Sequence, residues 1–104
     1  MADRLTPPQI QMKLEGLPGW TYKNEALMGE LQFSNHPEAI AFLVRLAFEC
    51  ERQNHHAEVC NVWATLTFTL RTHDADDQVT ERDVLLAHTI SELAERVGVA
   101  FVQL

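Results

Sequence analysis

The chain has 104 residues, of which 46% are hydrophobic and 22% charged, so we expect one soluble domain over residues 1–104. Fifteen acidic against eight basic residues give a net charge of −7, which argues against nucleic acid as a partner. The N-terminus lacks a signal-peptide core, and the longest apolar run, residues 39–44, is too short to span a bilayer. We therefore expect a cytoplasmic protein that does not contact membranes.

A short helix is predicted near the N-terminus. Thr6 is a suitable N-cap residue, and Pro7 and Pro8 fit the opening turn. Gln9 completes a capping box with Thr6, and Gly16 ends the helix.

Two short strands are predicted next. Trp20 and Tyr22 indicate the first strand, and a polar turn over residues 23–25 follows it. In the second strand the positions of one face are Leu27, Gly29, Leu31 and Phe33, and they alternate with mostly polar residues.

A long helix is predicted to begin within residues 34–37 and to end near Asn54. Its main apolar stripe consists of Ile40, Leu43, Val44 and Ala47. Phe42 and Leu46 widen this arc, which suits a helix covered on two sides, by a sheet and by another helix or subunit. We therefore expect a homo-oligomer, a dimer at least, although an edge strand could equally form the contact.

The segment 62–70 has the clearest strand pattern, with apolar residues at even positions and mostly Thr at odd positions. A last helix is predicted from Thr80 to Gly98. Its apolar face consists of Leu86, Ile90, Leu93, Ala94 and Val97. The order helix, strand, strand, helix, strand, helix indicates an α+β fold with helices on one face of an antiparallel sheet.

The two cysteines, Cys50 and Cys60, could form a disulfide in principle. A cytosolic protein usually keeps such thiols reduced and buried. We therefore interpret both as core residues.

Three of the five histidines, His55, His56 and His73, lie on either side of the segment 62–70. An imidazole accepts and donates protons near neutral pH, so three together favour general acid–base chemistry. Glu51 precedes His55 by four residues on the predicted helix and can orient that imidazole. The alternative is that these histidines are merely solvated.

The strand phase of His73 also contains Trp63 and Arg71, which indicates a shallow pocket with an aromatic floor. Trp63 could instead be a core residue, and Asp83 has an alternative role because Thr80 and Asp83 form a helix capping box. A zinc site built from the histidines and a cysteine is disfavoured, since adjacent histidines rarely converge on one ion and neither CxxC nor HExxH occurs. We expect no metal and no cofactor.

Four spaced motifs occur in order along the chain. They are Glu51-x-x-Asn54-His55-His56-x-Glu58, Asn61-Val62-Trp63, Leu70-x-Thr72-His73 and Thr80-x-x-Asp83-x-x-Leu86-Ala87. This set resembles the signature of the pterin-4a-carbinolamine dehydratases, and Gly19-Trp20 and Phe33 fit as well. The resemblance covers nearly the whole chain.

The resemblance implies a single α+β domain with a four-stranded antiparallel sheet and three helices packed on one face, in the order α-β-β-α-β-β-α. It also implies a tight turn near Ala64-Thr65, which would divide the segment 62–70 into two strands of a hairpin. Members of the family assemble into dimers and tetramers.

The implied activity is dehydration of 4a-hydroxytetrahydrobiopterin to quinonoid dihydropterin and water, as part of tetrahydrobiopterin recycling. An acid protonates the departing 4a-hydroxyl and a base takes the N5 proton, which requires no metal or cofactor. By position, His55 and His73 would be the main proton-transfer groups. His56 would bind and orient the pterin, and Glu51 would tune the site.

The resemblance also implies further contacts with the substrate. Besides His55 and His56, the implied pterin-binding positions are Ala57, Thr72, His73, Asp74 and Ala75, with Asp83 and Trp63 in support. Two departures bear on the substrate edge: Ala57 stands where the family has proline, and the loop over residues 74–79 is one residue longer and lacks a glycine. The alternative function is a non-catalytic member that acts as a dimerisation cofactor or assembly factor. Retention of Glu51, His55, His56 and His73 favours the enzyme.

Overall fold

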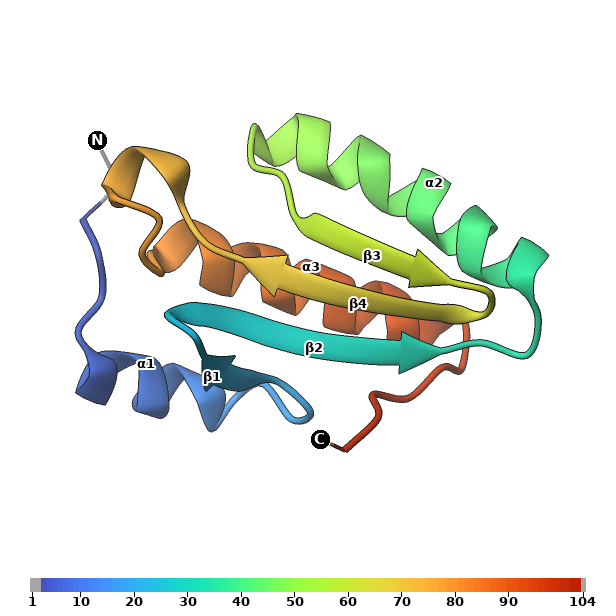
Figure 1. The fold of residues 1–104 in the computed structure, drawn as a ribbon, viewed down its shortest axis with the longest axis horizontal. Helices are drawn as coiled ribbons and strands as arrows, with labels where there is room; N and C mark the ends of the chain where they lie inside the picture. The colour runs from blue at the N-terminus through green and yellow to red at the C-terminus, as the bar shows by residue number, and fades with distance from the viewer. Residues whose placement is uncertain (1–2, 104) are drawn as a thin grey trace.

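A four-stranded antiparallel sheet with helices against it forms the domain (Figure 1). The computed structural model describes residues 3–103. In chain order the elements are α1 (Pro7–Leu14), β1 (Thr21–Lys23), β2 (Ala26–Gln32), α2 (His36–Gln53), β3 (Glu58–Val62), β4 (Thr65–Leu70), the short 3-10 turn η1 (His73–Ala75) and α3 (Glu81–Arg96). The predicted α+β class and the order α-β-β-α-β-β-α are confirmed. Within the described range, no helix has the length and apolarity needed to cross a membrane.

The sheet has the strand order β1-β2-β4-β3, so β3 is an edge strand. β3 and β4 form a hairpin in which Val62 pairs with Thr65, and the prediction of one continuous strand over residues 62–70 is wrong. Trp63 has a φ of 49°, in the left-handed region, and this reverses the chain. The alternation was misleading because Val62, before the turn, is apolar and even-numbered, as are the buried residues of β4 after it.

Helices α2 and α3 pack together against the sheet, and α1 lies beside β1 (Figure 1). The capping box predicted at Thr6 is present, although α1 ends at Leu14, before Gly16. In α3 the predicted core face is buried except at Val97, which is 60% exposed because the helix ends at Arg96.

Helix α2 has two apolar arcs, and the prediction selected the wrong one as the buried stripe. The residues of α2 that face the core are Ala39, Phe42, Leu46 and Cys50. Val44 is 55% exposed, Ala47 is exposed, and Ile40 and Leu43 are half-buried. Helical periodicity shows that both arcs are apolar, whereas the contacts of α2 with β4 and α3 decide which arc is buried.

Both cysteines are free, and they differ in environment. Cys50 is buried in the core, whereas Cys60 is exposed on β3, so its assignment to the core is wrong. Cys60 pairs with Thr67, and the residues on either side of Thr67, Leu66 and Phe68, are buried on the other face of the sheet, so the Cys60 side chain points away from the core. Burial raises the pKa of the Cys50 thiol, and the negative charges of Glu49 and Glu51 raise it further.

This difference predicts selective thiol labelling. In the native protein at neutral pH, an aromatic disulfide reagent should react with one thiol per chain, because the reagent needs an accessible thiolate. In denaturant it should react with two. Cys60→Ser should abolish the native reaction, whereas rapid native labelling of that variant would contradict the burial of Cys50.

Candidate active site

The end of α2 determines how the two adjacent histidines point. Asn54 is the C-cap residue with a φ of 51°, and its N–H donates to the carbonyls of Cys50 and Glu51. The N–H of His55 donates to the Cys50 carbonyl at 3.0 Å. This left-handed turn ends the helix and places His55 in the interior, where it is 7% exposed, while His56 stays outside.

The expected pairing of Glu51 with His55 is therefore wrong, since the helix has ended before His55. The Oε1 atom of Glu51 lies 3.6 Å from Nε2 of His56, and both side chains are largely exposed. An exposed pair of this kind contributes little to stability, so Glu51 affects His56 and not the buried imidazole.

His55 forms a short contact with a buried carboxylate. Its Nε2 lies 2.6 Å from Oδ1 of Asp83, which has no exposed surface. The other oxygen, Oδ2, accepts from the Thr72 hydroxyl at 2.8 Å and from the backbone N–H of Thr80 at 2.9 Å. Asp83 therefore completes the predicted capping box of α3 and also holds the imidazole.

The hydroxyls around Asp83 form a directed chain. The Arg82 N–H donates to the Thr80 hydroxyl, which lies 2.6 Å from the Thr72 hydroxyl, and Thr72 donates to Asp83. With both oxygens accepting, the carboxylate favours the tautomer in which Nε2 of His55 carries the proton. Nδ1 of His55 is then the nitrogen that can accept a proton.

His73 belongs to a loop and not to a strand. It begins η1, its side chain is 94% exposed, and its Nδ1 lies 3.0 Å from Oδ1 of Asp77. Asp76 and Asp77 have φ values of 56° and 58°, so two aspartates adopt the left-handed turn in this glycine-free loop. The side chain of Asp77 thereby reaches back to His73.

A pocket of about 330 Å³ brings the three imidazoles together. It is lined by Asn54, His55, His56, Arg71, Thr72, His73, Asp74 and Arg82. Five of these residues were predicted from the sequence, and Asp83 lies behind His55. A larger cavity of about 450 Å³ between α2 and α3 contains no imidazole and so offers no comparable proton-transfer group.

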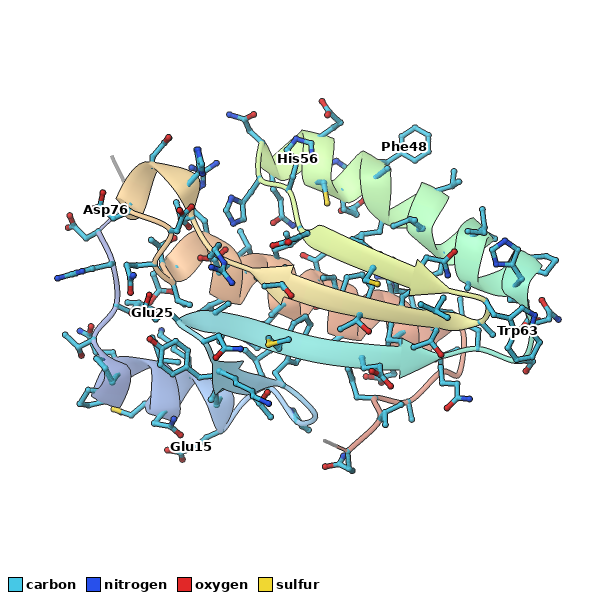
Figure 2. All side chains as sticks on the ribbon, in the orientation of Figure 1. Glu15, Glu25, Phe48, His56, Trp63 and Asp76 are labelled. Atoms are coloured by element: carbon cyan, nitrogen blue, oxygen red, sulfur yellow. The ribbon has the colours of Figure 1, made fainter. Side chains whose placement is uncertain are left out.

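Five predicted residues do not line this pocket: Asp83, which lies behind His55, and Glu51, Ala57, Ala75 and Trp63. Ala57 lies with Glu51 and His56 in a smaller cavity of about 210 Å³ between α2 and β3. Ala75 is the buried last residue of η1. Trp63 lies in the β3–β4 turn, at the far end of the molecule from His56, so the pocket has no aromatic floor from this residue (Figure 2).

Three lining residues were not predicted: Asn54, Arg71 and Arg82. Asn54 carried a signal, since asparagine commonly adopts the left-handed C-cap conformation. Arg82 donates from its guanidinium to the Asn54 carbonyl and ties the start of α3 to the end of α2. Arg71 was placed on the same predicted strand phase as His73, but it stood in the variable position of the motif around Thr72 and received no role.

No metal site accompanies the imidazoles in the described range. Across residues 3–103, no three side chains of His, Cys, Asp or Glu come close enough together to hold an ion. The exposed His73 points to Asp77, and the buried His55 points to Asp83, so the two imidazoles have separate carboxylate partners.

Comparison with known proteins identifies relatives along almost the whole chain. Residues 3–93 match the family model described as pterin 4 alpha carbinolamine dehydratase. A protein from Christiangramia forsetii with the provisional name pterin-4-alpha-carbinolamine dehydratase is 42% identical over 95 residues, covering 91% of this chain and 97% of its own. A protein from Opitutus terrae with the same provisional name is 42% identical over 90 residues, covering 86% and 93%.

A solved structure has the same fold. The crystal structure of a transcriptional coactivator/pterin dehydratase from Brucella melitensis superimposes with a TM-score of 0.83 at 30% sequence identity. The match covers 88% of this chain and 98% of that one.

Proposed function

The chain belongs to the pterin-4a-carbinolamine dehydratase family, and from that premise we propose that it dehydrates 4a-hydroxytetrahydrobiopterin to quinonoid dihydropterin and water. The observation that carries the proposal is the convergence of His55, His56 and His73 on one pocket, with Asp83 buried behind the first. In the cell this activity would serve tetrahydrobiopterin recycling. We place it in the cytoplasm, where an exposed thiol such as Cys60 stays reduced.

The reaction breaks the C4a–O bond, removes the N5 proton and forms a C4a–N5 double bond. Nδ1 of His55 is suited to accept the N5 proton, because Asp83 holds Nε2 and stabilises the imidazolium that results. His73, an exposed residue of the pocket lining, is suited to protonate the departing hydroxyl. The hydroxyl leaves as water with the proton from His73, while His55 retains the proton from N5. Loss of that proton from His55 to solvent and uptake of one by His73 restore the starting protonation state.

The remaining predicted residues have binding or tuning roles. His56 would orient the pterin at the mouth of the pocket, with Glu51 holding its imidazole. Asp74 and the backbone of Thr72 would contact the pterin edge, since both line the pocket. Ala57, Ala75 and Trp63 would act only indirectly, through the positions of the segments that carry the histidines.

The proposal is tested with freshly generated 4a-hydroxytetrahydropterin, whose dehydration is followed by absorbance. The purified protein should accelerate the reaction far above the rate in buffer. A heat-denatured sample and a protein of similar charge from an unrelated family serve as controls. A rate no better than that of buffer would end the enzyme proposal.

Metal removal provides a separate prediction. Exhaustive dialysis against a strong chelator should leave the dehydration rate unchanged, because three imidazoles and a carboxylate can supply the acid and the base. Rates before and after dialysis, each with and without added zinc, check this. A loss of activity that zinc restores would revive the metal alternative.

The second candidate function is a non-catalytic one, a dimerisation cofactor or assembly factor for another protein. The exposed apolar arc of α2 favours it, since this surface is suited to protein contact. The relative from Brucella melitensis is described as both coactivator and dehydratase, so the two functions need not exclude each other.

We also propose that the chain forms a homo-oligomer through the outer arc of α2, which exposes 55% of Val44 and 66% of Phe48. Sedimentation equilibrium at micromolar concentration should give a mass of at least twice 11.8 kDa. Phe48→Glu should shift the equilibrium toward the monomer, because a buried, unpaired carboxylate at the contact is costly.

The matched control is Met12→Glu, which places the same charge at a residue 71% exposed on α1. It should leave the mass unchanged. A Phe48→Glu protein that stays oligomeric would point to the edge of β3 instead. A wild-type mass near 11.8 kDa at all concentrations would show that the chain is a monomer.

A further inference from the structure

Arg71 is a cationic residue of the candidate active site to which the proposed reaction gives no role. It follows the last residue of β4 and lines the same pocket as the three imidazoles. Its Nε atom is buried and has no hydrogen-bond partner among the described residues. No described protein group accepts from this guanidinium, and because Arg71 lines the pocket, a ligand bound there can supply the hydrogen bonds that the protein leaves open.

The surrounding charges leave this guanidinium free to bind an anion. None of the ion pairs in the described part of the chain involves Arg71, although the chain carries fifteen carboxylates against eight cations. Asp74, the acidic residue of the pocket lining, is exposed and pairs with no cation there. The second guanidinium of the pocket, Arg82, already donates to the Asn54 carbonyl.

The position of Arg71 separates its role from proton transfer. The adjacent Thr72 points inward to Asp83, whereas Arg71 belongs to the opposite strand phase and is half-buried. Arg71 therefore lines the pocket from outside the hydrogen-bond network of Asp83 that holds His55. A substrate whose ring reaches the imidazoles would extend its side chain past the ring, toward such a neighbouring group.

We propose that Arg71 is a specificity-determining residue: pterins whose side chain ends in a phosphate ester or a carboxylate would bind more tightly than pterins with a neutral side chain, the hydroxylated side chain of the proposed biopterin substrate included. A guanidinium binds both oxyanions through paired hydrogen bonds. This inference rests on the proposed pterin site and extends it from the ring to the side chain.

Binding of two stable, fully oxidised pterins tests the inference without turnover. The pair should differ only at the end of the side chain, one with a hydroxyl and the other with its phosphate monoester. Calorimetric titration of the wild-type protein should show about tenfold tighter binding of the phosphate ester, the scale of one charge-assisted hydrogen bond. Arg71→Gln should remove this preference, and Arg71→Lys should retain part of it.

The matched control is Arg45→Gln, which makes the same charge change on α2, at the cavity that contains no imidazole. It should keep the full preference, which distinguishes local contact from net charge. Equal wild-type affinities, or a preference that survives in Arg71→Gln, would overturn the inference while leaving the dehydratase proposal intact. Failure of both pterins to bind would overturn the inference and the pterin site together.

Discussion

Replacement of both His55 and His73 by alanine should leave a folded protein with almost no dehydratase activity. Each single replacement should lower the rate by roughly 10–10⁴-fold, the scale of a lost general acid or base. The loss of rate should be larger in His55→Ala than in His73→Ala. The imidazole of His55 is held by Asp83, whereas His73 is exposed and water can more readily replace it. Single-turnover rates with 4a-hydroxytetrahydropterin provide the measurement.

His88→Ala is a suitable control for the double variant, since His88 is exposed on α3 and does not line the pocket. It should keep the wild-type rate. Circular dichroism of all variants establishes that they are folded. Wild-type activity in the double variant would show that the proton-transfer assignment is wrong.

Replacement of Asp83 by alanine should cause the largest loss of stability in the domain's polar interior. The carboxylate has no exposed surface and accepts from His55, Thr72 and Thr80. Removing it leaves buried donors without acceptors, which costs about 3–5 kcal/mol for a broken buried pair. Urea unfolding of the variant should show a correspondingly lower free energy of unfolding.

Asp83→Asn separates the stability effect from the chemical one. The amide keeps the shape of the carboxylate but can donate to Nε2 of His55, which would leave the proton on Nδ1, the nitrogen that should accept. We therefore expect a smaller loss of stability than in Asp83→Ala, together with a rate lower by roughly 10²–10⁴-fold. Full activity in Asp83→Asn would mean that the tautomer of His55 is unimportant.

Local sequence rules predicted most of the fold. The N-caps at Thr6 and Thr80 follow from side chains that satisfy nearby backbone groups. The end of α2 follows from Asn54, a residue type that readily adopts the left-handed C-cap conformation. The hairpin between β3 and β4 was the exception. It came from the family resemblance, because a left-handed Trp63 is a costly conformation that composition alone does not indicate.

The sequence predicted some of the residues that line the pocket, but it did not predict their geometry. Motif spacing identified His55, His56 and His73, but it paired His55 with Glu51 on the assumption of a continuing helix. The true partner, Asp83, lies 28 positions further along the chain. Such a contact depends on how α3 docks beside the end of α2, which no local pattern encodes.

The long-range character of this contact has a consequence for folding. The pocket is formed by the end of α2, the segment after β4 and the start of α3, joined at Asp83 and by the contact of Arg82 with the Asn54 carbonyl. None of these segments can form the site alone, so a chain in which α3 has not yet docked has no aligned imidazole. The proposed catalytic competence is therefore a property of the completed tertiary structure, and any opening that separates α3 from the end of α2 removes it.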